Sequence, residues 1–434
     1  MDKSPASKPD ILITNSVALN GGDAAILVSM VHAIKQSFEN ADITVQAKNS
    51  EACRKYYPDI NFIPGLEEKE KGRGLAEKIF FRLRYPRLCL YGLIQRLTGI
   101  APGFLASRQE KVILDSFRKS SIVVSCGGGF LNDLYPIFPR TLGFVLARIY
   151  GKKTAIFAQS VGPFTGSFSK LQAKWIIDGC SSVTVRDEKS LGIIRNELGC
   201  KNKNVSFTAD SAWLLQDMPL PESFSNPVEK IKKENAGSLI VGMSVRKWDF
   251  PEIDSQSMRD ELKENYRKVM KELCIHLVEN HHAQIVFIST CQGRPEYFTD
   301  DSVFANELRS ELPESIQKNI HVIGDAFDPR ILMYIMKSFD VFAGVRMHTV
   351  VLALLAGVPC AGIGYEFKTV ELFTQLGIKD YAVSLYDNPT GINQLVSNLI
   401  KNISHMKGLI VGKTSEMRLR AELNINSLKG AMKN

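Results

Sequence analysis

The feature that most constrains this chain is an alternation of strand, loop and helix that runs through it twice. Short apolar runs alternate with segments whose apolar residues recur at helical spacing, as at 24–38. Alternation of this kind predicts parallel strands joined by helical crossovers. The strands predicted in the first half are 10–15, 43–47, 121–125, 154–158 and 182–185.

The alternation stops at residues 216–237, which hold three prolines and a charged run, and then starts again. At 434 residues the chain is also too long for one core, since single cores stop growing at roughly 250–300 residues. We therefore predict an α/β protein of two Rossmann-like, doubly wound lobes that face each other across a cleft. The elements predicted after the break are strands at 238–243, 285–289, 340–345 and 359–363, and helices at 258–277, 347–356, 366–376 and 416–432.

These patterns also predict the domain boundaries. The first lobe covers 1–215 and carries a basic helical insertion at 67–112, and residues 216–237 form a linker. The second lobe covers 238–410. The last segment, 411–434, is a helix that we expect to pack back on the first lobe.

The net charge of +8 is concentrated in one segment. Ten basic and only three acidic residues lie between Lys69 and Lys111, and the rest of the chain is close to neutral. This excludes a general nucleic-acid binder, which needs a basic face, and favours a local anionic contact such as a membrane surface. Aromatic residues and leucines interleave with these cations, as in a helix lying in a membrane interface. The alternative is an insertion packed on the first lobe, with arginine stems covering apolar surface.

Cysteine usage and the N-terminus indicate a cytoplasmic protein, and the basic segment 69–111 favours peripheral contact at the inner face of the membrane. The eight cysteines form no CxxC pair, and a reducing compartment suits such scattered thiols. Residues 1–11 lack the apolar core of a signal peptide, and no run of 18 clean apolar residues occurs. No His, Asp or Glu cluster has the spacing of metal ligands, so we expect neither a metal nor a cofactor. Oligomeric state leaves no signal in the sequence.

The strongest candidate site follows two strands of the second half. Arg346 and His348 stand where the strand at 340–345 ends and a helix begins, and helix N-termini attract anions. Lys368 follows the next strand. Because adjacent parallel strands lie about 5 Å apart, we expect these three side chains to converge. Taken one at a time, a histidine at a helix start is usually a cap or a surface residue, and a lysine is usually solvated.

Two further arginines end strands, Arg186 in the first half and Arg246 in the second. Arginine suits bidentate binding of phosphate or carboxylate. A structural alternative for Arg186 is an ion pair with the adjacent Asp187.

Glycine-rich loops after the strands of the first half complete the set of candidates. In Asn20-Gly21-Gly22-Asp23, Asp23 either caps the following helix or binds an acceptor. Glycines let the backbone approach a ligand closely, but this chain lacks the GxGxxG of dinucleotide sites. The acceptor or cleft residues predicted are Asn20, Gly21, Asp23, Gly127, Gly128, Gly129, Asn132, Gln159 and Gly162.

Taken in order, these motifs resemble the polysaccharide pyruvyl transferase family over about 15–369. The first half carries the glycine loops, Gln159-Ser160-Val161-Gly162-Pro163, Val185-Arg186-Asp187-Glu188 and Asp210-Ser211-Ala212. The second half carries Gly242-Met243-Ser244-Val245-Arg246, and its most specific stretch runs from Arg346-Met347-His348 to Lys368. The basic segment 69–111 is not part of the resemblance.

The resemblance implies a GT-B-like fold and transfer of pyruvate from phosphoenolpyruvate, a co-substrate, to a sugar of a cell-envelope polysaccharide. It implies an acceptor, lipid-linked or nucleotide-linked, on the first lobe and the donor on the second. Family roles fall on Arg186, His348 and Lys368 as donor-binding or catalytic positions, with Arg346 beside them. Our hypothesis makes His348 the catalytic acid and base, and Arg186, Arg346, Lys368 and Arg246 the donor-binding residues.

Two other functions stay open. One is a GT-B glycosyltransferase that uses a nucleotide sugar; such enzymes often carry two glutamates seven residues apart in the second lobe, and the helix after His348 has none. The other is a non-catalytic binding module on the same fold.

Overall fold

The computed structural model describes residues 8–67, 83–133, 137–250, 253–364, 367–385 and 391–433. Part of the basic segment, from Lys69 to Arg82, lies outside the described residues, as do Tyr365 and Glu366.

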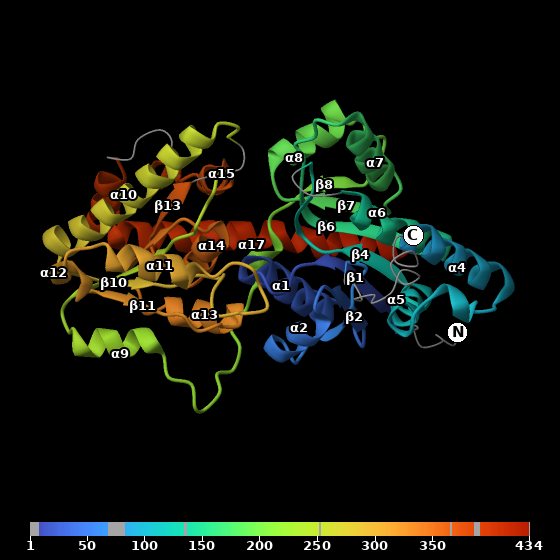
Figure 1. The fold of residues 1–434 in the computed structure, drawn as a ribbon, viewed down its shortest axis with the longest axis horizontal. Helices are drawn as coiled ribbons and strands as arrows, with labels where there is room; N and C mark the ends of the chain where they lie inside the picture. Colours follow the sequence, from blue (N-terminus) through green and yellow to red (C-terminus); the bar gives the residue numbers. More distant parts are fainter. Residues whose placement is uncertain are drawn as a thin grey trace. The chain divides into compact units, whose positions relative to one another are not determined.

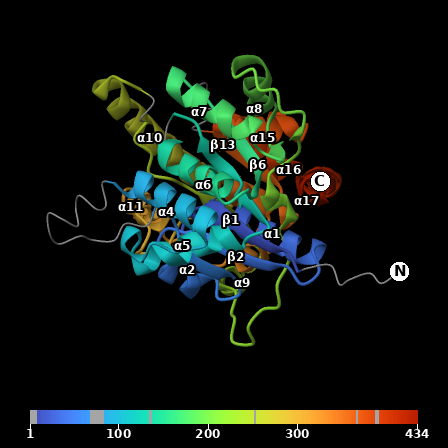
Figure 2. The ribbon, with the colours of Figure 1, turned by 90° about the vertical axis from the view of Figure 1, so that its right-hand side faces the viewer.

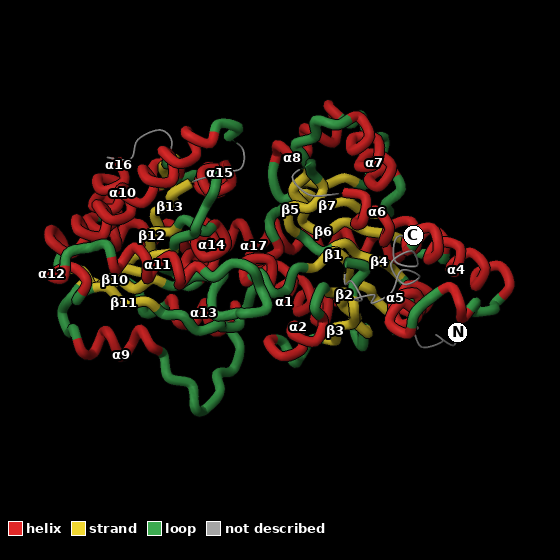
Figure 3. Tube along the Cα trace, viewed as in Figure 1, coloured by secondary structure: helices red, strands yellow, loops and turns green. Residues whose placement is uncertain are grey.

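The chain divides into two compact units. The first takes Met1–Leu19, Ile26–Leu214 and Arg418–Asn434, and the second takes Asn20–Ala25 and Leu215–Met417. Each unit has its own sheet with helices around it (Figures 1 and 3). The first turn of helix α1 (Gly21–Ser37) therefore belongs with the second unit, although the rest of that helix belongs with the first.

The sheet of the first unit has the order β3-β2-β1-β4-β6-β7-β8, and β5 pairs with β6. Every strand pair is parallel, and the start of the order, 3-2-1-4, is that of a doubly wound fold. Its strands are β1 Asp10–Ser16, β2 Asp42–Ala47, β3 Asn61–Pro64, β4 Ile122–Ser125, β5 Gly128–Leu131, β6 Lys153–Val161, β7 Ser182–Val185 and β8 Val205–Phe207.

Helices pack their apolar faces against this sheet. Leu88, Phe117 and Leu146, from three different helices, are buried together with Leu12 and Val123 of the sheet. A second cluster joins Ile176 and Ile177 to the other end of the sheet. Besides α1, the helices are α2 Ser50–Tyr56, α4 Arg84–Thr98, α5 Arg108–Lys119, α6 Ile137–Ile149, α7 Ser167–Asp178 and α8 Glu188–Gly192, and α4, α5, α6 and α7 are labelled in Figure 2.

The sheet of the second unit has the order β11-β10-β9-β12-β13-β14, also parallel throughout. Numbered within the unit, this is 3-2-1-4-5-6, the Rossmann order, in which ligands bind where the winding reverses, between β9 and β12. Its strands are β9 Leu239–Ser244, β10 Ala283–Phe287, β11 Ile320–Val322, β12 Val341–Gly344, β13 Cys360–Gly364 and β14 Ala382–Ser384. Its helices are α9 Pro227–Glu234, α10 Gln256–His281, α11 Asp301–Ser310, α12 Glu314–Gln317, α13 Pro329–Met336, α14 Met347–Leu355, α15 Phe367–Gln375 and α16 Gly391–Lys401.

The last helix, α17 (Ile403–Lys433), is longer than the predicted 416–432, and its final part belongs to the first unit. There Asn424 accepts a hydrogen bond from the hydroxyl of Thr208 at 2.7 Å and donates one to the carbonyl of Ala209 at 2.9 Å. The division of the chain into units falls inside this helix.

The predicted class, α/β with two parallel Rossmann-like sheets, is confirmed, and some local expectations are wrong. Helix α1 begins at Gly21 and not at Ala24, because Asn20 caps it. Strand β6 runs on to Val161, so Gln159 lies in a strand and not in a loop. The segment predicted as a linker contains helix α9, which starts with Asn226 as cap and a proline in its first turn. Among the described helices, none is long and apolar enough to cross a membrane.

Candidate functional site

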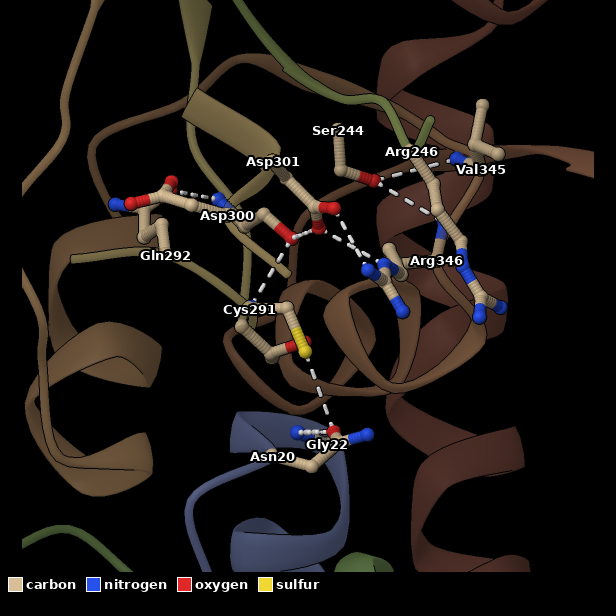
Figure 4. A network of polar contacts seen from close by, with 12 residues as sticks. Asn20, Gly22, Ser244, Arg246, Cys291, Gln292, Asp300, Asp301, Val345 and Arg346 are labelled. Carbon is tan, nitrogen blue, oxygen red and sulfur yellow. Dashed lines mark hydrogen bonds and ion pairs between the residues drawn. The ribbon is translucent and has the colours of Figure 1, made fainter. Parts of the chain in front are cut away.

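A cluster of polar side chains lies at the carboxyl edge of the second sheet, where its winding reverses. Strands β9 and β12 pair so that Ser244 stands beside Gly344, two residues before Arg346. Strand β10 ends next to β9 and continues into Ser289-Thr290-Cys291-Gln292. Figure 4 shows residues from these three strand ends turned toward one another.

The centre of the cluster is a buried ion pair between Arg346 and Asp301. The guanidinium donates from Nε to Oδ2 at 2.8 Å and from Nη2 to Oδ1 at 2.6 Å, and both residues are under 9% exposed (Figure 4). A bidentate pair fixes the plane of the guanidinium as well as its position. It also offsets the charge of Arg346, so this arginine brings less net positive charge to an anion than its type suggests.

Asp301 is held from two further sides. It is the first residue of α11, whose cap is Asp300, and a carboxylate in the first turn of a helix faces the positive end of the helix dipole. The hydroxyl of Ser289 donates a hydrogen bond to Oδ2 of Asp301. These contacts compensate the burial of a carboxylate, which would be costly without a partner.

Ser244 holds the turn between β12 and α14. Its Oγ accepts hydrogen bonds from the backbone N–H groups of Val345 at 3.2 Å and Arg346 at 3.3 Å. Helix α14 starts at the next residue, so His348 lies in its first turn, as the sequence predicted. The hydroxyl of the buried Thr349 accepts a hydrogen bond from the backbone N–H of Thr290 and thereby ties α14 to the loop after β10.

The two glycines of the Asn20 motif pack directly against this cluster. A Cβ on Gly22 would lie 2.7 Å from Nδ1 of His348, and a Cβ on Gly21 would overlap the carbonyl oxygen of Thr290 at 1.6 Å. Real Cβ atoms do not approach other atoms this closely, so no larger residue fits either position without a shift. The glycine motif and His348, predicted in different lobes, therefore meet in the second unit.

The side chain of Asn20 forms hydrogen bonds within the protein. Its Oδ1 accepts a hydrogen bond from the N–H of Gly22 at 3.0 Å and one from the thiol of Cys291 at 3.3 Å (Figure 4). Its Nδ2 donates to the hydroxyl of Tyr297 at 3.1 Å. Burial raises the pKa of Cys291, which keeps the thiol a donor, and burial raises the pKa of Tyr297 to about 12. The cap of α1 is thus Asn20 and not Asp23, since Asp23 lies within the first turn.

The other two candidate cations of the second unit, Arg246 and Lys368, follow strands that end at the same edge. The guanidinium of Arg246 stacks on Trp248, 4.1 Å from the ring centroid, and its backbone N–H donates to the hydroxyl of Tyr266 at 3.2 Å. Lys368 lies half-buried on α15, which follows β13, and β13 pairs with β12. The order of the strands thus puts Lys368 and Arg346 after neighbouring strand ends.

Arg186 lies in the first unit, just after β7, and is also paired. Its Nη1 donates to Oδ2 of Asp210 in an ion pair, and its Nε donates to Oγ of Ser160 at 2.8 Å. Arg186 and Asp210 are both buried. The partner is therefore not Asp187, the structural alternative raised above. Asp187 instead caps α8 by accepting from Ser190 and also accepts from the hydroxyl of Ser160.

Four predicted acceptor residues gather near Arg186. The register of β5 and β6 pairs Gly128 with Gln159, and a Cβ on Gly129 would lie 4.0 Å from Nη2 of Arg186. Asn132 donates from Nδ2 to the carbonyl of Gly129 at 2.9 Å. Gln159 is fully buried, and within the described ranges no group hydrogen-bonds its Oε1.

Packing accounts for the two remaining glycines. A Cβ on Gly127 would lie 2.9 Å from Ile26 and 3.0 Å from the carbonyl oxygen of Phe157. Gly162 has a φ of 78°, and a Cβ there would lie 2.7 Å from Ile193. These positions require glycine for structural reasons, whatever they bind.

The sequence interpretation missed the residues that hold the arginines. Asp301 carried a readable signal, because an aspartate pair directly before an apolar helical pattern marks a helix start. Ser289 ends the strand predicted at 285–289 and Thr290 follows it, which is the criterion used for the other candidates. Asp210 lies in Asp210-Ser211-Ala212, one of the stretches that carry the family resemblance, although its pairing with Arg186 was not predicted. Tyr297 carried no comparable signal. Within the described ranges, no group of three or more His, Cys, Asp or Glu residues could hold a metal ion.

Comparison with known sequences places this site in a family. The family model described as polysaccharide pyruvyl transferase matches residues 20–366, from the cap of α1 to two residues beyond β13. The chain is also 23% identical over 414 residues to the amylovoran biosynthesis protein AmsJ of Erwinia amylovora, covering 94% of this chain and 96% of that protein.

Solved structures with the same architecture are distant in sequence. Anabaena HepE, in complex with UDP-glucose, gives a TM-score of 0.58 at 11% identity, covering 97% of this chain and 98% of that one. A Listeria monocytogenes protein described as a putative UDP-N-acetylglucosamine 2-epimerase gives a TM-score of 0.55 at 12% identity. The match covers 93% of this chain and 91% of that one. At such identities the likeness concerns the fold, which is GT-B-like.

Proposed function

The chain belongs to the polysaccharide pyruvyl transferase family, and on that premise we propose that it moves pyruvate from phosphoenolpyruvate to two hydroxyls of one sugar. The product would be a cyclic ketal on an exopolysaccharide, capsule or cell-wall polymer, and phosphate would be released. The relationship to an amylovoran biosynthesis protein supports a polysaccharide pathway.

The observation that carries the proposal is the placement of Arg346 and His348 at the start of α14, at the switch point of a Rossmann-order sheet. The N-terminus of a helix attracts an anion through the positive end of the helix dipole. Asp301 holds the guanidinium of Arg346 in a fixed orientation at this end of α14, through the two bonds described above. Lys368 and Arg246 would supply net positive charge to a donor that carries both phosphate and carboxylate.

The reaction balances without a further reactant. The methylene carbon of phosphoenolpyruvate takes up a proton and becomes the methyl group, which leaves positive charge on C2. One sugar hydroxyl attacks C2, and the C–O bond to phosphate breaks. The second hydroxyl then attacks C2 and closes the ring. The two hydroxyl protons end on the methyl group and on the released phosphate.

His348 is the group that we assign to proton transfer. Imidazole changes its charge near neutral pH, and a positioned acid or base contributes about 10²–10⁴-fold to rate. Gly22 lies directly against one side of the ring, so the imidazole cannot swing toward that side.

A direct test incubates the full-length chain with phosphoenolpyruvate and a panel of lipid-linked and nucleotide-linked sugars. We expect phosphate release that depends on one acceptor, which gains the mass of one pyruvate less one water. His348→Gln should lower the rate about 10²–10⁴-fold, while His405→Ala, at an exposed position on α17, should leave it unchanged.

Other outcomes would point elsewhere. Release of a nucleotide from a nucleotide sugar, without phosphoenolpyruvate, would identify a glycosyltransferase. Failure to bind phosphoenolpyruvate by calorimetry would favour a non-catalytic module. Full activity in His348→Gln would remove the histidine from the mechanism.

A further inference from the structure

Exposed apolar side chains are concentrated on the segment from α4 to α5 of the first unit. Phe104 is 80% exposed and Leu97 is 74% exposed. On α4 the exposed positions follow helical spacing, opposite the face that buries Leu88 and Tyr91. The large apolar residues exposed in this segment are Leu83, Leu90, Leu93, Leu97, Ile100, Phe104 and Val112, which we call the α4 apolar face.

The exposed charges within residues 83–112 have one sign, and the next charged residue, Asp115, is paired with Arg118. Within 83–112 the sole carboxylate is Glu110, and it is fully buried against Arg84 and Arg87. Arg96 and Arg108 are exposed and Lys111 is half-buried. The guanidinium of Arg96 donates to the backbone carbonyls of Arg148 and Ile149, contacts that leave its charge uncompensated.

The support beneath this face is firmly held. Glu110 lies 3.0 Å from Nε of Arg84 and 2.8 Å from Nη2 of Arg87, which joins α5 to α4. The hydroxyl of Tyr150 donates to Gln95 at 2.7 Å and ties α4 to the end of α6. The exposed side chains are therefore presented by helices whose inner faces are buried and paired, and not by a segment without contacts.

We propose that the α4 apolar face docks on a membrane surface that contains anionic lipid. Leucine, isoleucine and phenylalanine insert into the interfacial region, while neighbouring arginine and lysine meet lipid phosphates. A soluble surface rarely leaves so many large apolar residues together without a partner. A second copy of the chain fits poorly, because a symmetric contact would put these cations against each other in a chain of net charge +8.

The proposal is tested by flotation of the full-length chain with vesicles, without any substrate, so it does not depend on the proposed function. One set of vesicles is phosphatidylcholine alone, and the other contains 30%–40% phosphatidylglycerol, about the anionic content at which surface attraction is strong. Binding should need the anionic lipid and fall in high salt, by about fivefold for each cation that contacts the surface.

The key variant is Leu93→Glu/Leu97→Glu, which puts carboxylates on the face and should lower bound protein at least tenfold. Phe104→Ser is a milder second variant and should lower the amount of vesicle-bound protein several-fold. The matched control is Leu419→Glu on α17 in the same unit, because Leu419 is 65% exposed but stands near the exposed Glu416 and Glu422. Thermal melting checks that each variant is folded.

Three results would overturn the proposal. One is no binding of the unaltered chain to anionic vesicles, and another is equal binding by Leu93→Glu/Leu97→Glu. The third is dimerisation that the same double variant abolishes, without vesicle binding, which would identify the face as an interface between copies.

Discussion

At the scale of single residues, the contact between Gly22 and His348 makes the site sensitive to one methyl group. Gly22→Ala would place a Cβ 2.7 Å from Nδ1 of the imidazole, which must then turn away. We expect kcat for phosphate release to fall by at least about tenfold, because small misplacements of a catalytic group are costly. Stability should change little, since the ring can move.

The control for this variant is Gly192→Ala in helix α8, where a new Cβ meets nothing within 4 Å. Alanine is the better helix former, so this change should leave activity and stability intact. Gly21→Ala should be worse than Gly22→Ala in both measurements, since its Cβ overlaps a backbone carbonyl that cannot rotate away. Equal activity of Gly22→Ala and the unaltered chain would show that His348 tolerates displacement.

Asp301 is a positioning residue in our interpretation, because it acts through Arg346. Asp301→Asn replaces one accepting oxygen with an NH2 group that faces the guanidinium. We expect kcat/KM for phosphoenolpyruvate to fall about 10- to 100-fold, mainly through KM if Arg346 binds the donor before the chemical step. Ser289→Ala removes a hydrogen bond to the same carboxylate and should give a smaller effect in the same direction.

The control for Asp301→Asn is the same substitution at the neighbouring Asp300. Asp300 caps α11 by accepting from the N–H of Ser302 at 2.9 Å, and asparagine is an equally good cap. Asp300→Asn keeps the cap and loses only the hydrogen bond that Oδ2 accepts from the N–H of Gly293 at 3.0 Å, so it should change both kinetic constants far less than Asp301→Asn does. A loss of kcat/KM in both variants alike would show that the helix start, and not the ion pair, controls the site.

At the scale of elements, one buried carboxylate joins α4 to α5. Burial by itself would raise the pKa of Glu110, but the hydrogen bond from Arg87, that from the backbone of Ser107 and the two arginine charges outweigh it and lower the pKa below its ordinary 4.5. A lowered folded-state pKa means that the ionised form stabilises the fold above about pH 4.5, and that this contribution is lost as the pH falls below it.

Glu110→Gln should therefore lower the free energy of unfolding by about 3–5 kcal/mol at pH 7, because it leaves two buried arginines without their carboxylate. The difference in free energy of unfolding between this variant and the unaltered chain should shrink below about pH 4.5. Urea titrations at several pH values measure that difference. The control is Asp115→Asn on the same helix, which breaks an exposed ion pair with Arg118 and should lower the free energy of unfolding by less than about 1 kcal/mol. A similar loss of stability in Glu110→Gln and Asp115→Asn would contradict the importance of the buried pair.

At the scale of the whole molecule, the end of the chain completes the unit in which the chain begins. Leu428 of α17 is 1% exposed, whereas Leu423 on the same helix is 45% exposed. Leu428→Ala should lower the stability of the first unit by about 2–5 kcal/mol, the usual cost of truncating a buried leucine. Leu423→Ala should be nearly neutral.

The readout for this pair is the fluorescence of Trp213, which is fully buried in the first unit and whose carbonyl accepts a hydrogen bond from Arg418. Trp175 also lies in the first unit and Trp248 lies in the second, so a Trp175→Phe/Trp248→Phe background isolates the fluorescence of Trp213. If Leu428→Ala and Leu423→Ala unfold at the same urea concentration, α17 does not contribute its buried face to the first unit.

The sequence alone determined the class of fold and the position of the main motifs. Strand and helix periods are local properties, so the alternation predicted two parallel sheets, and a helix directly after β12 put His348 in a first turn. The boundaries were less predictable. A side chain such as that of Asn20 decides where a helix starts, and pairing with neighbouring strands lets β6 continue through Gln159.

Only the tertiary structure decided which groups pair. Arg346 and Asp301 are 45 residues apart, and Arg186 and Asp210 are 24 apart. Gly22 meets His348 across more than three hundred residues. Such contacts depend on strand order and helix packing, which no local pattern encodes. A guanidinium that looks like a free cation in the sequence is in the fold a partly neutralised, oriented donor, because burying its charge requires a carboxylate beside it.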